Sequence, residues 1–121
     1  MVDNIVRLRR VFAMAFIPIE QLNRLYDGYQ KAFKIAGWDL LLLQQGGVPI
    51  IIENRCPHMD APLTFAEQVA GGLLRCRAHG IAFSLSTGKA CGPLANTIDC
   101  LKKFPVVYDG NQLGIDPEAG D

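Results

Sequence analysis

The chain has 121 residues, of which 50% are hydrophobic and 20% are charged. This length and composition are typical of one folded domain and exclude a disordered or fibrous chain. The 12 Lys and Arg residues balance the 12 Asp and Glu residues, so net charge provides no general attraction to nucleic acid. No apolar run approaches the ~20 residues of a membrane span. We therefore expect neither a nucleic-acid partner nor a membrane partner.

The N-terminal segment does not have the pattern of an export signal. Arg7, Arg9 and Arg10 precede an apolar stretch, residues 11–17, which is short and ends at Pro18. Glu20 then stands where a small-residue cleavage site is required. We expect a cytoplasmic protein with reduced thiols, because four cysteines are also too few for a disulfide scaffold.

Residues 11–17 are apolar and partly β-prone, which predicts a first strand. Pro18 and the spacing of Leu22, Leu25 and Tyr29 then predict a short N-terminal helix or helical turn over residues 19–27, closed by Gly28.

From residue 30 the pattern changes to short β segments. We predict strands over residues 30–35, 39–44 and 49–54, with a hairpin turn at 45–47, and over 103–108 and 112–115 around Asp109-Gly110-Asn111. The middle, residues 55–93, is richer in Gly, Pro and polar residues. We interpret it as loops carried on a small all-β frame, where functional sites tend to lie.

Both histidines of the chain follow a cysteine closely. Cys56 and His58 form a C-x-H motif, and Cys76 and His79 form a C-x-x-H motif after 17 intervening residues. Two histidines placed by chance would seldom both fall beside a cysteine, so the pattern indicates a metal site. Two thiolates with two imidazoles suit a structural zinc ion or an iron–sulfur centre with mixed ligands.

The sequence around these motifs resembles the Rieske-type [2Fe–2S] ferredoxins, of the low-potential kind found in oxygenase systems. Residues 55–63 read Arg-Cys-Pro-His-Met-Asp-Ala-Pro-Leu, and residues 74–83 read Leu-Arg-Cys-Arg-Ala-His-Gly-Ile-Ala-Phe. The likeness continues through Ser86-Thr87-Gly88 and Gly92-Pro93 to the Phe104-Pro105-Val106 segment. It covers roughly residues 11–116 and favours iron–sulfur over zinc.

The resemblance implies an all-β, Rieske-like fold of three small antiparallel sheets with a two-loop cluster-binding subdomain. It implies one Rieske-type [2Fe–2S] cluster, with Cys56 and Cys76 on the inner iron and His58 and His79 on the outer iron. Residues 1–10 would form an N-terminal extension, residues 11–116 a single Rieske domain, and residues 117–121 a C-terminal tail. Gly80 and Gly88 would allow tight loop geometry.

The resemblance also implies a soluble one-electron carrier and no catalytic residue. Electrons would pass from a flavoprotein ferredoxin reductase to a terminal, ring-hydroxylating type oxygenase. We expect both partners to dock near the cluster tip, formed by His58, Met59, His79, Ile81, Pro93 and Leu94. One alternative is an integral small Rieske subunit of a larger oxidoreductase such as a nitrite reductase, and another is a zinc-stabilised binding module without a redox role.

The chain lacks two features of high-potential Rieske proteins. We therefore expect the midpoint potential of its cluster to lie near the low end of the Rieske range, which runs from about −150 to about +300 mV. High-potential members carry a disulfide between the two loops, where this chain has Ala61 and Ala78, and a serine hydroxyl, where it has Ile81. Fewer hydrogen-bond donors leave the reduced, more negative cluster less stabilised.

Cys91 and Cys100 have no His or Cys at ligand spacing, so we expect each to be a small buried hydrophobe. Phe83 is expected to pack beneath the second motif.

Overall fold

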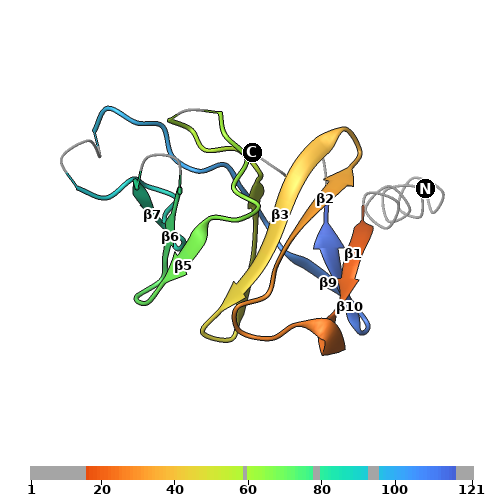
Figure 1. Cartoon of the computed structure of the whole chain (residues 1–121). Helices are drawn as coiled ribbons and strands as arrows, with labels where there is room; N and C mark the ends of the chain where they lie inside the picture. Colours follow the sequence, from red (N-terminus) through yellow and green to blue (C-terminus); the bar gives the residue numbers. More distant parts are fainter. Residues whose placement is uncertain (1–15, 59, 78–79, 93–95, 117–121) are drawn as a thin grey trace, which may run out of the picture.

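A computed structural model of the chain describes residues 16–58, 60–77, 80–92 and 96–116, and shows three small antiparallel sheets (Figure 1). The first sheet contains β1 (Ile17–Gln21), β10 (Gln112–Ile115) and β9 (Val107–Asp109), in that order. The second contains β2 (Gln30–Ile35), β3 (Trp38–Gln45), β4 (Val48–Glu53) and β8 (Lys103–Phe104). The third contains β5 (Glu67–Val69), β6 (Leu73–Arg75) and β7 (Ala82–Ser84). The predicted all-β fold of three sheets is confirmed.

The four-stranded sheet separates two hydrophobic cores. Successive side chains of a strand face opposite sides, so Leu41 and Leu43 enter one core while Leu40 and Leu42 enter the other. All four leucines are fully buried. This explains why β3 is a continuous apolar run and not an alternating one.

The hairpin between β3 and β4 has the predicted turn. Gly46 and Gly47 both have positive φ, at 62° and 79°, and they connect Gln45 to its partner Val48. Positive φ at both central positions defines the type I′ turn, whose twist matches that of the flanking strands.

The first sheet and the four-stranded sheet enclose one core, which includes Leu113 and Ile115 from β10. The β1–β10 pairing requires a glycine at Gly114, because a Cβ there would lie 1.9 Å from the carbonyl oxygen of Ile17. The third sheet lies on the other side and contributes Leu74 and Phe83 to the second core.

Of the helix or helical turn predicted over residues 19–27, the helix is wrong and only a helical turn is present. Ile19, Glu20 and Gln21 belong to strand β1, and only a 3-10 turn, η1 (Leu22–Arg24), follows it. The apolar spacing is real, but pairing with β10 satisfies the backbone of this segment instead. Of the strand predicted over residues 11–17, residues 11–15 lie outside the described residues.

Two further expectations need correction. Residues 103–108 are not one strand: β8 ends at Phe104 and β9 begins at Val107, in a different sheet. Pro105 stands at the break, where it has no N–H to give to a sheet. The interval 55–93 is not all loop, since it contains β5, β6 and β7. No helix in the described parts of the chain is long and apolar enough to cross a membrane.

Candidate metal centre

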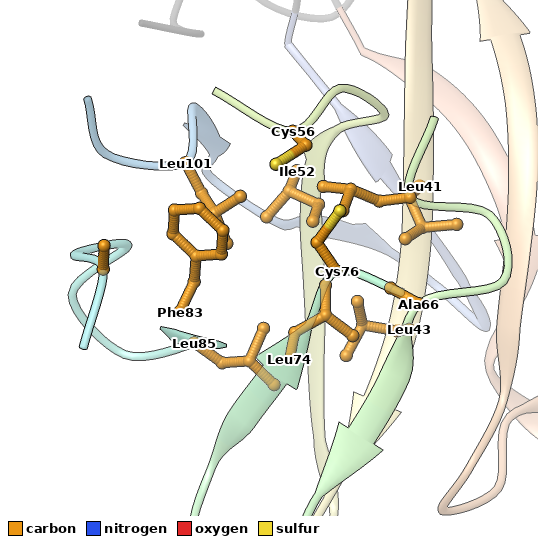
Figure 2. Packing of buried hydrophobic residues seen from close by; sticks show 12 residues of the cluster. Leu41, Leu43, Ile52, Cys56, Ala66, Leu74, Cys76, Phe83, Leu85 and Leu101 are labelled. Carbon is orange, nitrogen blue, oxygen red and sulfur yellow. The ribbon is translucent and has the colours of Figure 1, made fainter. Parts of the chain in front are cut away.

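Cys56 and Cys76 lie in one hydrophobic core although they follow strands of different sheets. Cys56 comes shortly after β4 and Cys76 directly after β6. Their exposed fractions are 0% and 2%, and both pack in the cluster that contains Leu74 and Phe83. Figure 2 shows both sulfur atoms among these buried side chains. The fold therefore brings the two predicted thiol ligands to the same region, shielded from water.

The first loop, residues 56–61, is closed by two backbone hydrogen bonds. The N–H of Cys56 donates to the carbonyl of Ala61, and the N–H of Asp60 donates to the carbonyl of Cys56, both at 2.8 Å. Asp60 has a φ of +60°, a left-handed conformation that Asp tolerates better than most residues. The Arg55 guanidinium hydrogen-bonds the Asp60 carboxylate and lies 3.6 Å from Glu53. These contacts raise the pKa of Arg55, which therefore stays cationic beside the loop.

The second loop, residues 76–81, repeats the same pair of backbone hydrogen bonds. The N–H of Cys76 donates to the carbonyl of Ile81 at 2.9 Å, and the N–H of Gly80 donates to the carbonyl of Cys76 at 2.7 Å. Gly80 has a φ of +70°, so the fourth residue after each cysteine is left-handed. The two loops thus share the same two backbone hydrogen bonds and a left-handed residue at the same position. The expectation that Gly80 serves tight loop geometry is confirmed.

Of the two histidines, the structure describes only His58. His58 is exposed, two residues after buried Cys56, so the first loop carries a thiol inside and an imidazole outside. His79 lies outside the described residues, as do Met59, Pro93 and Leu94 of the predicted docking tip. Within the residues that are described, no three Cys, His, Asp or Glu side chains come together as a metal-binding group. Ile81 is half-buried and packs against the thiol-containing core.

Side-chain amides hold the segment that follows the first loop. Asn54 accepts from the N–H of Leu63 at 2.7 Å and donates to the Thr64 hydroxyl at 2.8 Å. Gln30, far away on β2, donates to the carbonyls of Thr64 at 2.9 Å and Ala66 at 2.8 Å. No motif in the sequence marks either amide. Only the position of Asn54 just before the first motif offers a hint, because the hydrogen bonds of Gln30 span 34 and 36 residues of chain and leave no local pattern.

Gly88 has the tight loop geometry expected of it, and Phe83 packs beneath the second motif as expected. A Cβ on Gly88 would lie 2.9 Å from the carbonyl oxygen of Leu101, and the φ of Gly88 is +80°. This close approach lets the N–H of Leu101 donate to the Gly88 carbonyl at 2.7 Å. Phe83 is fully buried and pairs with Leu74, two residues before Cys76.

The expectation that Cys91 and Cys100 are buried is wrong, because both are exposed. Each follows or precedes a residue that faces the core: Ala90 is 4% exposed and pairs with Phe83, and Leu101 is 4% exposed. In extended chain, neighbours of inward-facing residues point outward. All four cysteines lie in the described part of the chain, and none is in a disulfide.

The described donors fit an iron–sulfur cluster. Two thiols share one apolar core, an imidazole stands at the surface of the same loop, and the described residues include no buried charged side chain. Thiolate is the usual ligand of iron in such clusters, and imidazole replaces it on one iron in the Rieske type.

A small all-β domain with thiols buried beneath two matched loops belongs to the class of iron–sulfur electron-transfer domains. Residues 15–105 match the Rieske [2Fe-2S] domain family. The chain therefore belongs to the Rieske family, and its cofactor is a Rieske [2Fe–2S] cluster. The expected cofactor is confirmed, and the zinc alternative is not supported.

Similar proteins include ferredoxins of oxygenase systems. The chain is 28% identical over 103 residues to the ferredoxin component of the alkene monooxygenase system of Xanthobacter autotrophicus, covering 85% of this chain and 82% of that protein. It is 34% identical over 82 residues to the 3-phenylpropionate/cinnamic acid dioxygenase ferredoxin subunit of Escherichia coli, covering 66% and 74%. A chain in the solved complex of reduced oxygenase and oxidized ferredoxin in carbazole 1,9a-dioxygenase superposes with a TM-score of 0.72. That match has 19% identity and covers 84% of this chain and 93% of that one, which indicates a shared fold.

Proposed function

We propose that this protein is the ferredoxin of an oxygenase system. It accepts one electron at a time from a flavoprotein reductase and passes it to a terminal oxygenase of the ring-hydroxylating type. The observation that carries the proposal is the pair of matched loops with buried thiols at Cys56 and Cys76. The two relatives named above, a monooxygenase ferredoxin and a dioxygenase ferredoxin, support the same role.

The ligand assignment is part of the proposal. Cys56 and Cys76 bind the inner iron, and His58 and His79 bind the outer iron. When bound, the cluster stores one electron between the donor and the acceptor. The protein excludes water from the two thiolates by burial, and it presents the His58 ring at the surface, where a partner can approach.

Charge favours two imidazoles over two further thiolates at this site. An oxidised [2Fe–2S] core with four thiolates carries a net charge of −2, whereas two thiolates and two neutral imidazoles leave it at zero. Burying an unpaired charge is costly, and the described part of the core around Cys56 and Cys76 contains no buried cation to offset it. A neutral cluster therefore suits this core better than a dianion.

We propose that residues 11–116 form a single Rieske domain, with residues 1–10 as an extension and residues 117–121 as a tail. The protein functions in the cytoplasm, where thiols stay reduced. Two exposed thiols, Cys91 and Cys100, are consistent with that compartment.

An anaerobic electron count tests the proposed function. The purified protein is analysed for iron and acid-labile sulfide and then titrated with dithionite, with ferric cytochrome c as the final acceptor. We expect two irons and two sulfides per chain, uptake of one electron, and quantitative transfer of that electron to cytochrome c. A chain that holds the cluster but takes up no electron would contradict a carrier role.

A further inference from the structure

Phe65 is an exposed aromatic residue beside the metal centre. Its exposed fraction is 80%, higher than that of the other large exposed hydrophobic residues in the described chain, Tyr26, Tyr108 and Val48. It lies four residues after Ala61, the end of the first loop. A large apolar side chain that remains in water at such a position is a candidate contact for another protein.

The backbone around Phe65 is held on three sides. Gln30 fixes the carbonyls of Thr64 and Ala66, and the Arg77 side chain donates to the carbonyl of Phe65 itself. Gln68 donates to the Gln30 side-chain oxygen at 2.9 Å and so fixes the orientation of that amide. A contact residue held in place loses less entropy when a partner binds.

Two hollows flank Phe65, and Arg77 lines both. One, of about 360 Å³, also reaches Cys76 and Pro62. The other, of about 380 Å³, lies toward Gln30 and Glu67. Phe65 thus borders two recesses of the surface. The recess toward Gln30 can receive an apolar side chain of a partner beside this exposed aromatic residue.

Arg77 differs in charge pairing from the other arginines that the structure describes. Arg24, Arg55 and Arg75 each have a carboxylate within 4.0 Å. Arg77 is exposed and has no ion pair among the described residues. Its guanidinium keeps further N–H donors beyond the one on Phe65, in a geometry that matches a carboxylate.

We propose that Phe65 and Arg77 form a docking anchor for the terminal oxygenase, which presents a carboxylate next to an apolar side chain. This inference rests on the proposed function and adds residues that the predicted docking tip does not contain. Arg77 directly follows Cys76, so a partner held by this anchor lies against the second loop, where electron transfer must occur. Small, partly apolar interfaces are typical of such transient encounters. The oxygenase is the partner seen with a fold relative in a solved complex.

The test isolates the oxygenase half of the reaction. Cluster-loaded protein is reduced with dithionite, and turnover of the oxygenase of its own system is measured against ferredoxin concentration. Phe65→Ala and Arg77→Gln are compared with two matched controls on other sheets, Tyr108→Ala and Lys34→Gln. Tyr108 is a 55% exposed aromatic residue on β9, and Lys34 an exposed cation on β2.

We expect each anchor variant to raise KM about tenfold at unchanged kcat, with the electron paramagnetic resonance spectrum unaltered. Phe65→Ala should also leave the midpoint potential unaltered. Arg77→Gln should also reduce the salt dependence of KM, because an ion pair is lost. If Arg77→Gln loses the cluster, the KM of Phe65→Ala alone tests the anchor. The Phe65 side chain is mostly exposed, so its removal should leave the cluster in place.

Three outcomes would overturn the inference. Anchor variants that behave like Tyr108→Ala and Lys34→Gln remove the anchor but leave the carrier role intact. Anchor variants that are normal in this dithionite-driven assay, but are reduced more slowly by the flavoprotein in a separate assay, assign the surface to the reductase instead. Wild-type protein that supports no oxygenase turnover refutes the proposed function, and the anchor with it.

Discussion

The first loop and the second loop reach the same backbone geometry with different residues. In both, the cysteine N–H and carbonyl are bonded to the fifth and fourth residues that follow. The left-handed position is Asp60 in the first loop and Gly80 in the second. Asp60 is held by the Arg55 ion pair, whereas glycine adopts this conformation without assistance. The backbone hydrogen bonds therefore specify the loop geometry, and the residue at the left-handed position determines the conformational cost of that geometry.

The loops also differ in where their imidazole falls. The first loop carries His58 two residues after its cysteine, and the second carries His79 three residues after. Relative to the shared pair of backbone hydrogen bonds, the histidine therefore occupies a different sequence position in each loop. Loss of either cysteine should therefore have the same effect on the cluster. Changes in the backbone of one loop should have a different effect from changes in the other.

The largest expected effect is loss of a thiol. Cys56→Ala and Cys76→Ala should each abolish the cluster, because both sulfurs lie in the shielded core and no other described cysteine is buried. Cys91→Ala is the matched control and should keep the cluster with stability changed by about 0.5 kcal/mol or less, since its side chain is exposed. Iron and sulfide analysis checks all three. Retention of a normal cluster in either core variant contradicts the assignment.

Replacement of a histidine should change the type of centre. His58→Ala and His79→Ala should each lose the Rieske spectrum, because an imidazole bond to the outer iron is removed. Electron paramagnetic resonance of the reduced variants measures the effect. An unaltered spectrum in either variant would show that the ring is not a ligand.

At both left-handed positions, alanine should reduce the stability of the protein more than glycine does. Gly80→Ala should destabilise the protein by about 1–2 kcal/mol, because alanine is strained at positive φ, although no described atom lies within 4 Å of the added Cβ. Asp60→Ala should cost more than Asp60→Gly, which keeps the backbone relaxed and loses only an exposed ion pair. Urea unfolding of the loaded protein measures each cost. Equal costs for the two Asp60 variants would remove the backbone explanation.

The smallest effect concerns the midpoint potential. Ile81→Ser should raise it by roughly 20–60 mV, the equivalent of one added hydrogen bond to the reduced centre in a one-electron couple. The wild-type midpoint itself should lie near the low end of the Rieske range. A redox titration that gives a wild-type value well above 0 mV, or a fall in the Ile81→Ser variant, would contradict the account of the low potential.

Local sequence patterns predicted the parts of the fold that local physics controls. The Gly46-Gly47 turn and the leucine run of β3 were read correctly, because positive φ and strand periodicity act on neighbouring residues. The helix over residues 19–27 and the single strand over 103–108 were wrong, since pairing with β10 and a change of sheet at Pro105 are long-range events.

The sequence predicts the candidate metal ligands of the site but not the side chains that hold the ligand loops in place. Cysteine and histidine are rare enough here that their spacing stands out, but amides such as Asn54 and Gln30 look like any surface residue. Exposed Cys91 and Cys100 were misjudged because composition alone treats cysteine as a buried residue. Their outward direction follows only from inward-facing Ala90 and Leu101.

The most direct measurement is electron paramagnetic resonance of the dithionite-reduced protein, purified without air. Two sulfur and two nitrogen ligands predict a rhombic signal whose average g lies below that of all-thiolate clusters, together with two acid-labile sulfides per chain. A colourless protein with stoichiometric zinc, or a signal typical of four thiolates, would contradict the ligand set.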